Sequence, residues 1–123
     1  MKVLVADDSG TMRKIIVRNL QAIGITDVTE AADGAEAVAK FKPGAFQLVL
    51  TDWNMPNRSG PDVVREIRAM DAGVPVVMVT TEAEKSRVLQ AIQAGVSDYL
   101  IKPFTSETLR QKVERLCGAA TQA

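Results

Sequence analysis

The amino-acid sequence predicts an α/β fold, a (βα)5 three-layer sandwich in which helices cover both faces of a five-stranded parallel sheet. Two observations support this prediction. Short apolar runs alternate along the chain with segments of helical periodicity, and such alternation favours right-handed crossovers between parallel strands. The stronger runs are nearly continuous, which is typical of strands buried on both faces. A length of 123 residues accommodates a single domain of this kind.

Five segments have the pattern of strands. Four of them are apolar runs, at residues 3–6, 48–50, 74–79 and 99–101. The remaining segment, 26–31, is centred on Val28 and alternates between apolar and polar residues, so we expect it nearer an edge of the sheet.

Each strand segment is followed by a helical segment, and local residues mark the helix ends. The first helix stops at Gly24, and its apolar positions are Met12, Ile15, Ile16, Leu20 and Ile23. Asp33 is a candidate N-cap of the second helix, which ends at Pro43-Gly44 and carries Ala37, Val38 and Phe41.

The last three helices show the same signals. Pro61 fits the first helical position of the third helix, and Gly73 follows its end. The fourth helix stops near Gly95, and Thr105 or Ser106 begins the fifth. The apolar positions are Val63, Val64, Ile67 and Met70 in the third helix, Val88, Leu89 and Ile92 in the fourth, and Leu109, Val113 and Leu116 in the fifth.

The composition excludes several classes of function. Without histidine, the chain cannot form a Ser-His-Asp triad, an imidazole base or a His-bearing zinc site. A single cysteine, Cys117, excludes an internal disulfide and a CxxC redox pair, and we expect no functional role for it. Fifteen basic and fifteen acidic side chains balance without a basic stripe, so neither nucleic acid nor a membrane is an expected partner. The apolar N-terminus is too short for a signal peptide, and we expect a cytoplasmic monomer.

Polar side chains stand at the carboxyl ends of four predicted strands. Along the chain, Asp7 and Asp8 follow the first predicted strand, Asp52 the third, Thr80 the fourth and Lys102 the fifth. Because ligands of open α/β sheets bind outside the carboxyl ends of the strands, we expect these groups to converge on one rim.

The chemistry of this group favours a cation and a phosphoryl group. Two carboxylates at ~4 Å repel by about 4 kcal/mol at an effective dielectric constant of ~20, which raised pKa values or a bound cation would offset. Oxygen ligands without His or Cys suit Mg²⁺. With an ammonium from Lys102 and a hydroxyl from Thr80, such a site is suited to phosphoryl oxygens. Asp52 is then available to form an aspartyl phosphate.

Four segments around these polar residues carry a family resemblance. They are Val5-Ala6-Asp7-Asp8-Ser9, Thr51-Asp52-Trp53-Asn54-Met55-Pro56-Asn57, Met78-Val79-Thr80-Thr81-Glu82-Ala83 and Tyr99-Leu100-Ile101-Lys102-Pro103-Phe104. They resemble the receiver domain of two-component response regulators, and most closely its stand-alone, CheY-like chemotaxis regulators. The resemblance extends over the whole chain. It implies a flavodoxin-like sheet with strand order 2-1-3-4-5, and a single receiver domain at 1–123 with no output domain.

The resemblance also implies a role for each site residue. Asp52 resembles the phosphoryl acceptor, and Asp8 a direct Mg²⁺ ligand. Asp7 would bind the metal directly or through water, with Asp52 and the backbone carbonyl of Asn54 as further ligands. Lys102 resembles the lysine that pairs with the acceptor and then with the phosphoryl oxygens.

Other positions resemble residues that switch or tune the domain. Thr80 matches the switch hydroxyl and Tyr99 the aromatic ring that becomes buried on activation. Asn54 and Glu82 match positions that tune the lifetime of the phosphoryl group. Without the resemblance, Tyr99 is an ordinary half-buried ring, and Asn54 and Glu82 are plain loop residues. The resemblance further implies a cis Lys102-Pro103 bond, and we expect Trp53 to lie exposed beside the site.

The function implied is a phosphorylation-driven switch that is not a conventional enzyme. A histidine kinase would donate its phosphohistidine phosphoryl group, and a phosphatase is a further candidate partner. The output would be binding of another protein, most plainly a flagellar motor switch, to the face formed by the fourth helix, fifth strand and fifth helix. The alternative is a phosphorelay intermediate that passes its phosphate to a histidine phosphotransfer protein.

The residues fit three other classes of protein less well. Phosphatases of the haloacid dehalogenase class carry an acid two residues after the nucleophile, where this chain has Asn54, and usually a cap domain. An FMN-binding electron carrier needs a phosphate-binding loop after the first strand, where Asp7 and Asp8 would repel the FMN phosphate. A degenerate receiver that serves only as a scaffold is disfavoured because every acceptor-site residue is present.

Overall fold

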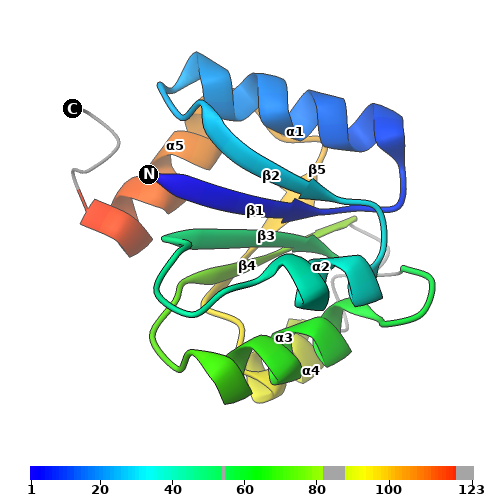
Figure 1. Ribbon diagram of the computed structural model, residues 1–123. Coiled ribbons are helices and arrows are strands. Elements are labelled where there is room, and N and C mark those ends of the chain that lie inside the picture. The colour runs from blue at the N-terminus through cyan, green and yellow to red at the C-terminus, as the bar shows by residue number, and fades with distance from the viewer. Residues whose placement is uncertain (54, 82–87, 119–123) are drawn as a thin grey trace.

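Strands and helices alternate along the chain from β1 to α5, as the sequence predicts (Figure 1). The computed structural model describes residues 1–53, 55–81 and 88–118. The elements are β1 (Lys2–Ala6), α1 (Gly10–Ala22), β2 (Asp27–Ala31), α2 (Gly34–Lys40), β3 (Leu48–Asp52), α3 (Gly60–Met70), β4 (Val76–Thr81), α4 (Val88–Ala94), β5 (Asp98–Lys102) and α5 (Ser106–Cys117). In the part of the chain that the structure describes, we find no helix long and apolar enough to cross a membrane.

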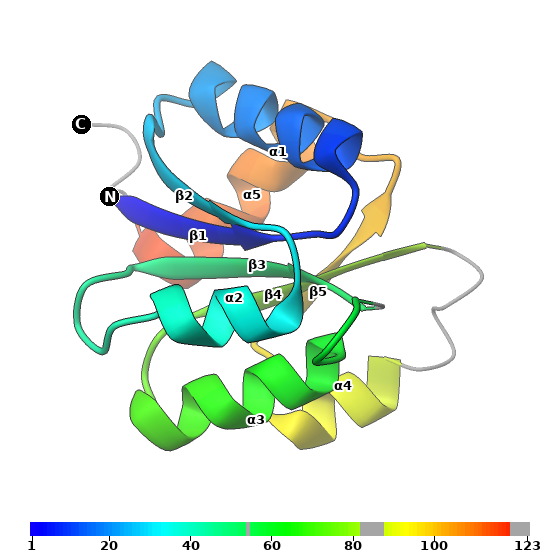
Figure 2. The same cartoon turned by 45° about the vertical axis from the view of Figure 1, so that its right-hand side comes forward.

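The five strands form one parallel sheet in the order β2-β1-β3-β4-β5. This order confirms the predicted flavodoxin-like topology and places β2, the alternating segment, at an edge. Helices α1 and α5 cover one face of the sheet, and α2, α3 and α4 cover the other (Figures 1 and 2). All strands therefore end on the same side, which lies to the right in Figure 1.

Two apolar cores fill the space between the sheet and its two helical layers. Leu4 and Val49 belong to the core under α2, α3 and α4, whereas Val3 and Leu50 belong to the core under α1 and α5. Successive side chains of a strand point to opposite faces, so a strand buried on both faces needs apolar residues at every position. The continuous runs in the sequence have this cause.

Side-chain caps begin four of the helices. Each cap residue adopts an extended backbone, and its side-chain oxygen accepts a hydrogen bond from the amide three residues later. The capping residues are Ser9, Asp33, Ser59 and Thr105. The cap at Asp33 was predicted, and of the two candidates for the last helix Thr105 is the cap and Ser106 the first helical residue.

The structure corrects two details of the predicted elements. The fourth strand spans Val76–Thr81 instead of 74–79, because the β-branched Thr80 and Thr81 continue the ladder opposite Ile101 and Lys102. Some apolar positions of the predicted helices lie at the margin of the buried stripe and are exposed, namely Ile15, Met70 and Ile92.

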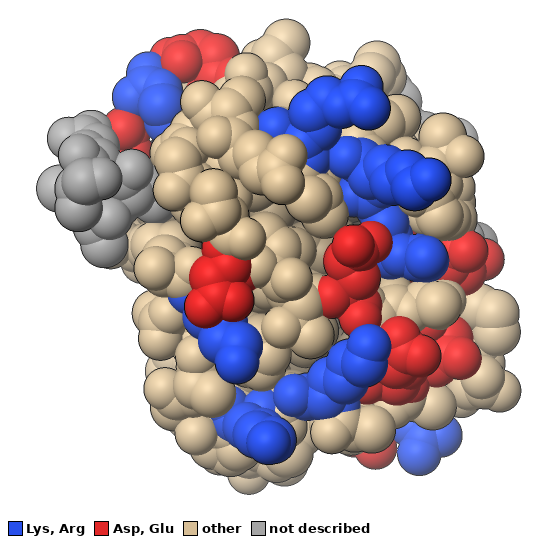
Figure 3. All heavy atoms as spheres, turned by 45° about the horizontal axis from the view of Figure 1, so that its top comes forward, with Lys and Arg blue, Asp and Glu red and all other residues tan. Residues whose placement is uncertain are grey.

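Charged side chains are mixed on the surface. On the face seen in Figure 3, basic side chains lie beside acidic ones. Ion pairs between such side chains include Arg13–Glu30 and Lys40–Glu36, at 3.2 and 3.1 Å.

Candidate functional site

Three carboxylates meet at the carboxyl end of the sheet. Asp7 and Asp8 follow β1, and Asp52 is the last residue of β3, the strand next to β1 in the sheet. One oxygen of each residue lies within 4.8 Å of one oxygen of both others. Asp7 is buried, with 1% of its surface exposed, whereas Asp8 is exposed and Asp52 lies between these extremes. The predicted convergence of these residues is therefore present.

Lys102, the last residue of β5, reaches the same rim from the far side of β4. Its Nζ lies 3.0 Å from Oδ1 of Asp52 and 3.5 Å from Oδ2 of Asp7. The peptide bond between Lys102 and Pro103 is cis, as the family resemblance implies. One ammonium is thus shared by two carboxylates, and the negative charge of the cluster exceeds the positive charge.

Burial and the neighbouring charges shift the pKa values of Asp52 and Lys102. Burial raises the pKa of Asp52 above the ordinary carboxyl value; the hydrogen bond from Lys102 opposes this effect, and the charge of Asp7 adds to it. Burial alone would lower the pKa of Lys102, but the hydrogen bond and the charge of Asp52 outweigh it, so the pKa of Lys102 rises. Lys102 is therefore a cation at neutral pH, while the metal-free fold favours the ionised form of Asp52 less than water does.

The donor set fits a hard divalent cation. Carboxylate oxygens crowded at one point, with excess negative charge, are the ligands that Mg²⁺ takes in proteins. A cation at this point would offset the mutual repulsion of Asp7, Asp8 and Asp52 and lower the pKa of Asp52.

Comparison with known proteins agrees with this geometry. The family model of the response regulator receiver domain matches residues 3–114. The chain belongs to this family. It is 43% identical over 118 residues to the chemotaxis protein CheY of Pseudomonas aeruginosa, covering 94% of this chain and 95% of the relative. It is 45% identical over 121 residues to the chemotaxis protein CheY1 of Helicobacter pylori, covering 96% of this chain and 98% of the relative.

Solved receiver structures have the same fold. The chemotaxis protein CheY4 of Vibrio cholerae superposes with a TM-score of 0.84 at 35% identity, covering 94% of this chain and 97% of that one. The receiver domain of a sensor histidine kinase from Pseudomonas aeruginosa, with a magnesium ion in its active-site cleft, gives 0.83 at 30% identity, covering 95% and 97%. As a response regulator receiver, this chain is a phosphoacceptor signalling protein rather than a conventional enzyme, and the phosphatase and FMN-carrier alternatives are set aside.

Trp53 corrects one expectation about this receiver domain. It is 5% exposed and packs in the core under α3 with Val49 and Val63, not in solvent beside the site. The two-residue alternation of β3 continues one residue past its end, so that Trp53 falls on the same face as Val49.

The backbone near Asp52 is held by a close approach of α3. The amide of Gly60, the first residue of α3, donates to the carbonyl of Trp53 at 2.7 Å. A Cβ at Gly60 would lie 2.3 Å from the carbonyl oxygen of Asp52, a distance that real Cβ atoms do not reach. Glycine at position 60 is therefore required for α3 to pack against the end of β3, and the sequence alone gave no sign of this.

A second close approach fixes the loop after β3. A Cβ at Gly34, the first residue of α2, would lie 2.2 Å from the carbonyl oxygen of Arg58. Asn57 in this loop has a φ of 70°, and its Nδ2 donates to Oδ2 of the cap residue Asp33 at 3.2 Å. The start of α2 thus holds the loop in place.

The two predicted switch residues lie on neighbouring strands. Thr80 in β4 is buried, and it follows Val79, the register partner of Asp52. Tyr99 in β5 is partly buried and packs against the core under α3 and α4. The Nζ of Lys112 lies 5.4 Å from the centroid of its ring. Asn54 and Glu82, predicted to bind metal or tune the phosphoryl lifetime, lie outside the described residues, and their roles stay predictions.

Proposed function

We propose that Asp52 accepts a phosphoryl group from the phosphohistidine of a partner histidine kinase in a Mg²⁺-dependent reaction. One observation carries this proposal: three carboxylates from two adjacent strand ends share one point with a single ammonium, 3.0 Å from Asp52. Membership of the receiver family and the magnesium-bound cleft of a relative at 30% identity support it.

The metal would be held by this chain's own oxygens. Asp7, Asp8 and Asp52 would supply carboxylates, and the backbone of Asn54 a carbonyl. When bound, Mg²⁺ supplies positive charge that stabilises the oxygens of the phosphoryl group during transfer.

Three residues of the chain act directly in phosphoryl transfer. A carboxylate oxygen of Asp52 forms the bond to phosphorus while the bond between phosphorus and the donor's imidazole nitrogen breaks, and the imidazole keeps that electron pair. Lys102, already paired with Asp52, moves its ammonium to the phosphoryl oxygens. The hydroxyl of Thr80 donates a hydrogen bond to the same oxygens. Attack of water on phosphorus later releases inorganic phosphate and restores Asp52.

The output would be a change in protein binding. Movement of Thr80 toward the phosphoryl group would let Tyr99 turn inward and reshape the surface of α4, β5 and α5. A cavity of about 270 Å³ already opens on this surface, and Tyr99, Phe104, Thr108 and Lys112 line part of it. Because several relatives are chemotaxis proteins, we favour a flagellar motor switch as the target, with a histidine phosphotransfer protein as the alternative. The cytoplasmic location stays a prediction.

Incorporation of radiolabelled phosphate tests the acceptor. We expect hydroxylamine-labile label on the wild type in the presence of Mg²⁺, and none on Asp52→Asn or after removal of Mg²⁺ with EDTA. Asp62→Asn, a change to an exposed carboxylate in α3, serves as the matched control and should keep the label. Label that persists on Asp52→Asn would refute the assignment.

A binding measurement distinguishes the two outputs. We expect the complex with beryllofluoride, which imitates a phosphoryl group, to bind the flagellar motor switch protein of the same organism more tightly than the free receiver. Rapid transfer of label from Asp52 to a histidine phosphotransfer protein, without such binding, would favour the phosphorelay alternative.

A further inference from the structure

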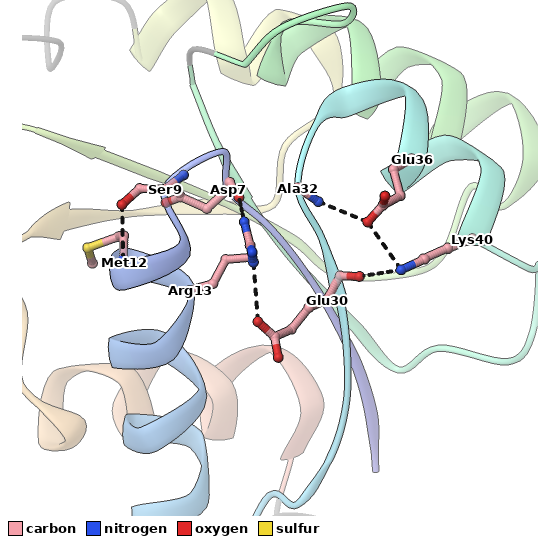
Figure 4. Close-up of polar contacts among 8 residues, drawn as sticks. All are labelled: Asp7, Ser9, Met12, Arg13, Glu30, Ala32, Glu36 and Lys40. Atoms are coloured by element: carbon pink, nitrogen blue, oxygen red, sulfur yellow. Dashed lines mark hydrogen bonds and ion pairs between the residues drawn. The ribbon is translucent and has the colours of Figure 1, made fainter.

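Arg13, near the start of α1, contacts the backbone of Asp7, one of the three clustered carboxylate residues (Figure 4). Its Nη1 donates a hydrogen bond to the carbonyl oxygen of Asp7 at 2.7 Å. Its Nε donates to Oε1 of Glu30, in the edge strand β2, at 3.2 Å. The side chain is only 20% exposed, so these contacts are partly shielded from water. The guanidinium therefore links α1, β2 and the end of β1.

The carbonyl that Arg13 binds belongs to the peptide unit joining Asp7 to Asp8. A peptide unit is planar, so fixing its oxygen also fixes its amide and the direction in which the next residue leaves. Three other contacts hold Asp7: its amide donates to the carbonyl of Ala31 at 3.1 Å, its Oδ1 accepts from the amide of Ser9 at 2.9 Å, and its Oδ2 lies 3.5 Å from Nζ of Lys102. The bond from Arg13 ends on the peptide unit between the two carboxylate residues itself.

Glu30, the side-chain partner of Arg13, lies in a strand end that α2 holds in place. Lys40, in α2, donates from its Nζ to the carbonyl of Glu30 at 2.7 Å and to Oε1 of Glu36 at 3.1 Å. The same Oε1 of Glu36 accepts the amide of Ala32 at 3.0 Å, so α2 fixes the end of β2 (Figure 4). Arg13 thus lies between a fixed strand end and the carboxylate cluster, and its Nε and Nη1 each bind one of the two.

We propose that Arg13 is a positioning residue of the metal site. It would hold the Asp7–Asp8 peptide so that both carboxylates face the rim before a cation arrives, and its positive charge would reduce their repulsion. This inference rests on the proposed Mg²⁺-dependent function, and it adds a residue that touches neither metal nor phosphoryl group. Outer-shell partners of metal ligands typically change metal affinity by about 10- to 100-fold when they are lost.

Titration calorimetry with Mg²⁺ alone tests the proposal on the folded, full-length chain. We expect Arg13→Gln to raise the Kd for Mg²⁺ on the order of 10-fold. Lys14→Gln removes a positive charge from the next position of α1, where the side chain is exposed, and should change the Kd by less than about twofold. Arg13→Lys keeps the charge but cannot reach Asp7 and Glu30 together, so its Kd should remain several-fold above that of the wild type.

Each other outcome has a definite meaning. Wild-type affinity in Arg13→Lys would overturn positioning in favour of charge alone, and a Kd for Arg13→Gln within about twofold of wild type would overturn the inference altogether. A wild type that does not bind Mg²⁺ would instead refute the proposed function. Urea unfolding of the metal-free variants separates positioning from folding, because a merely structural arginine would lower the free energy of unfolding and leave the Kd unchanged. If Arg13→Gln does not fold, the comparison of Arg13→Lys with Lys14→Gln carries the test.

Discussion

The pKa of an aspartate is shifted in opposite directions at the two ends of the sheet. At the carboxyl end, burial and a second carboxylate raise the pKa of Asp52. Near the amino end, Asp71 follows α3 and accepts the amides of Gly73, Val74 and Gly44 at 3.0, 3.2 and 3.3 Å. These backbone hydrogen bonds, that of Gly73 first, lower the pKa of Asp71. An ionised carboxylate thus stabilises the fold where backbone amides bind it, and opposes the fold where burial removes its water and a second carboxylate lies near.

The cations at the two ends differ in the same way. Lys102, at the carboxyl end, pairs with side chains that a metal and a phosphoryl group are proposed to share. Arg68, at the amino end, donates to the carbonyl of Gly95 at 2.8 Å and to Oγ of Ser97 at 3.1 Å. It also donates to the carbonyls of Asp71, Ala72 and Val74. Arg68 therefore fastens α3 to the start of β4 and to the connection before β5, whereas Lys102 pairs with the carboxylates of the proposed metal site.

The most severe test of this contrast is the loss of Arg68. We expect Arg68→Ala to lower the free energy of unfolding by about 3 kcal/mol or more, because several partly buried carbonyls lose their donor. The Kd for Mg²⁺ should stay near the wild-type value, since the site lies at the other end of the sheet. Urea unfolding and titration calorimetry measure the two effects. Arg68→Lys keeps the charge but not the fork of donors, so its free energy of unfolding should lie between those of the wild type and Arg68→Ala. A loss below about 1 kcal/mol in Arg68→Ala would contradict the structural role of Arg68.

Substitution of one glycine at each end of the sheet tests how closely the backbone is packed there. Gly60→Ala forces a methyl group against the carbonyl of Asp52 and against Sδ of Met78, 2.3 and 3.0 Å from the new Cβ. We expect a loss of about 2 kcal/mol in the free energy of unfolding, typical of overpacking, and weaker Mg²⁺ binding because the end of β3 must move. At Gly73 the nearest atom lies 3.8 Å from a new Cβ, so Gly73→Ala should change stability by less than about 0.5 kcal/mol. Equal effects of the two substitutions, measured by urea unfolding, would contradict this contrast.

The fold and the carboxylate cluster were predictable because both follow from short-range patterns. Continuous apolar runs marked the strands, and parallel strands bring their carboxyl ends to one edge, where Asp7, Asp8, Asp52 and Lys102 meet. Asp33 marked a helix start by its own capping chemistry.

What the sequence did not reveal depends on distances between elements far apart in the chain. Nothing local distinguishes Arg13 and Arg68 from exposed arginines; their partners lie in other strands and loops. Gly60 is required only because α3 approaches β3 so closely. Trp53 was placed wrongly because its role was judged from its neighbour Asp52 instead of from the strand alternation that buries it.

Neutralising Asp52 should change the free energy of unfolding less than the substitutions of Arg68 and Gly60 do, and should raise it instead of lowering it. A raised pKa means that ionised Asp52 opposes folding at neutral pH. Asp52→Asn should therefore raise the free energy of unfolding of the metal-free protein by about 1 kcal/mol, and Mg²⁺ should no longer stabilise it. Asp62→Asn, which breaks only the exposed pair with Arg65, should lower stability by no more than about 0.5 kcal/mol. A metal-free Asp52→Asn that is less stable than wild type would show that Lys102 outweighs burial and Asp7.

The smallest expected effect is the pH dependence contributed by Asp71. A lowered pKa means that the ionised group stabilises the fold above the ordinary carboxyl value of 3.8, and that this contribution is lost as the pH falls through the lowered pKa. Thermal unfolding without metal, from about pH 7 to about pH 3, should show Asp71→Asn below wild type at neutral pH, with the gap closing in acid. For Asp52→Asn the gap has the opposite sign and closes at a higher pH, because the pKa of Asp52 is raised. Acid should thus relieve the repulsion at the carboxyl end before it weakens the amino end, and a gap for Asp71→Asn that widens in acid would contradict this order.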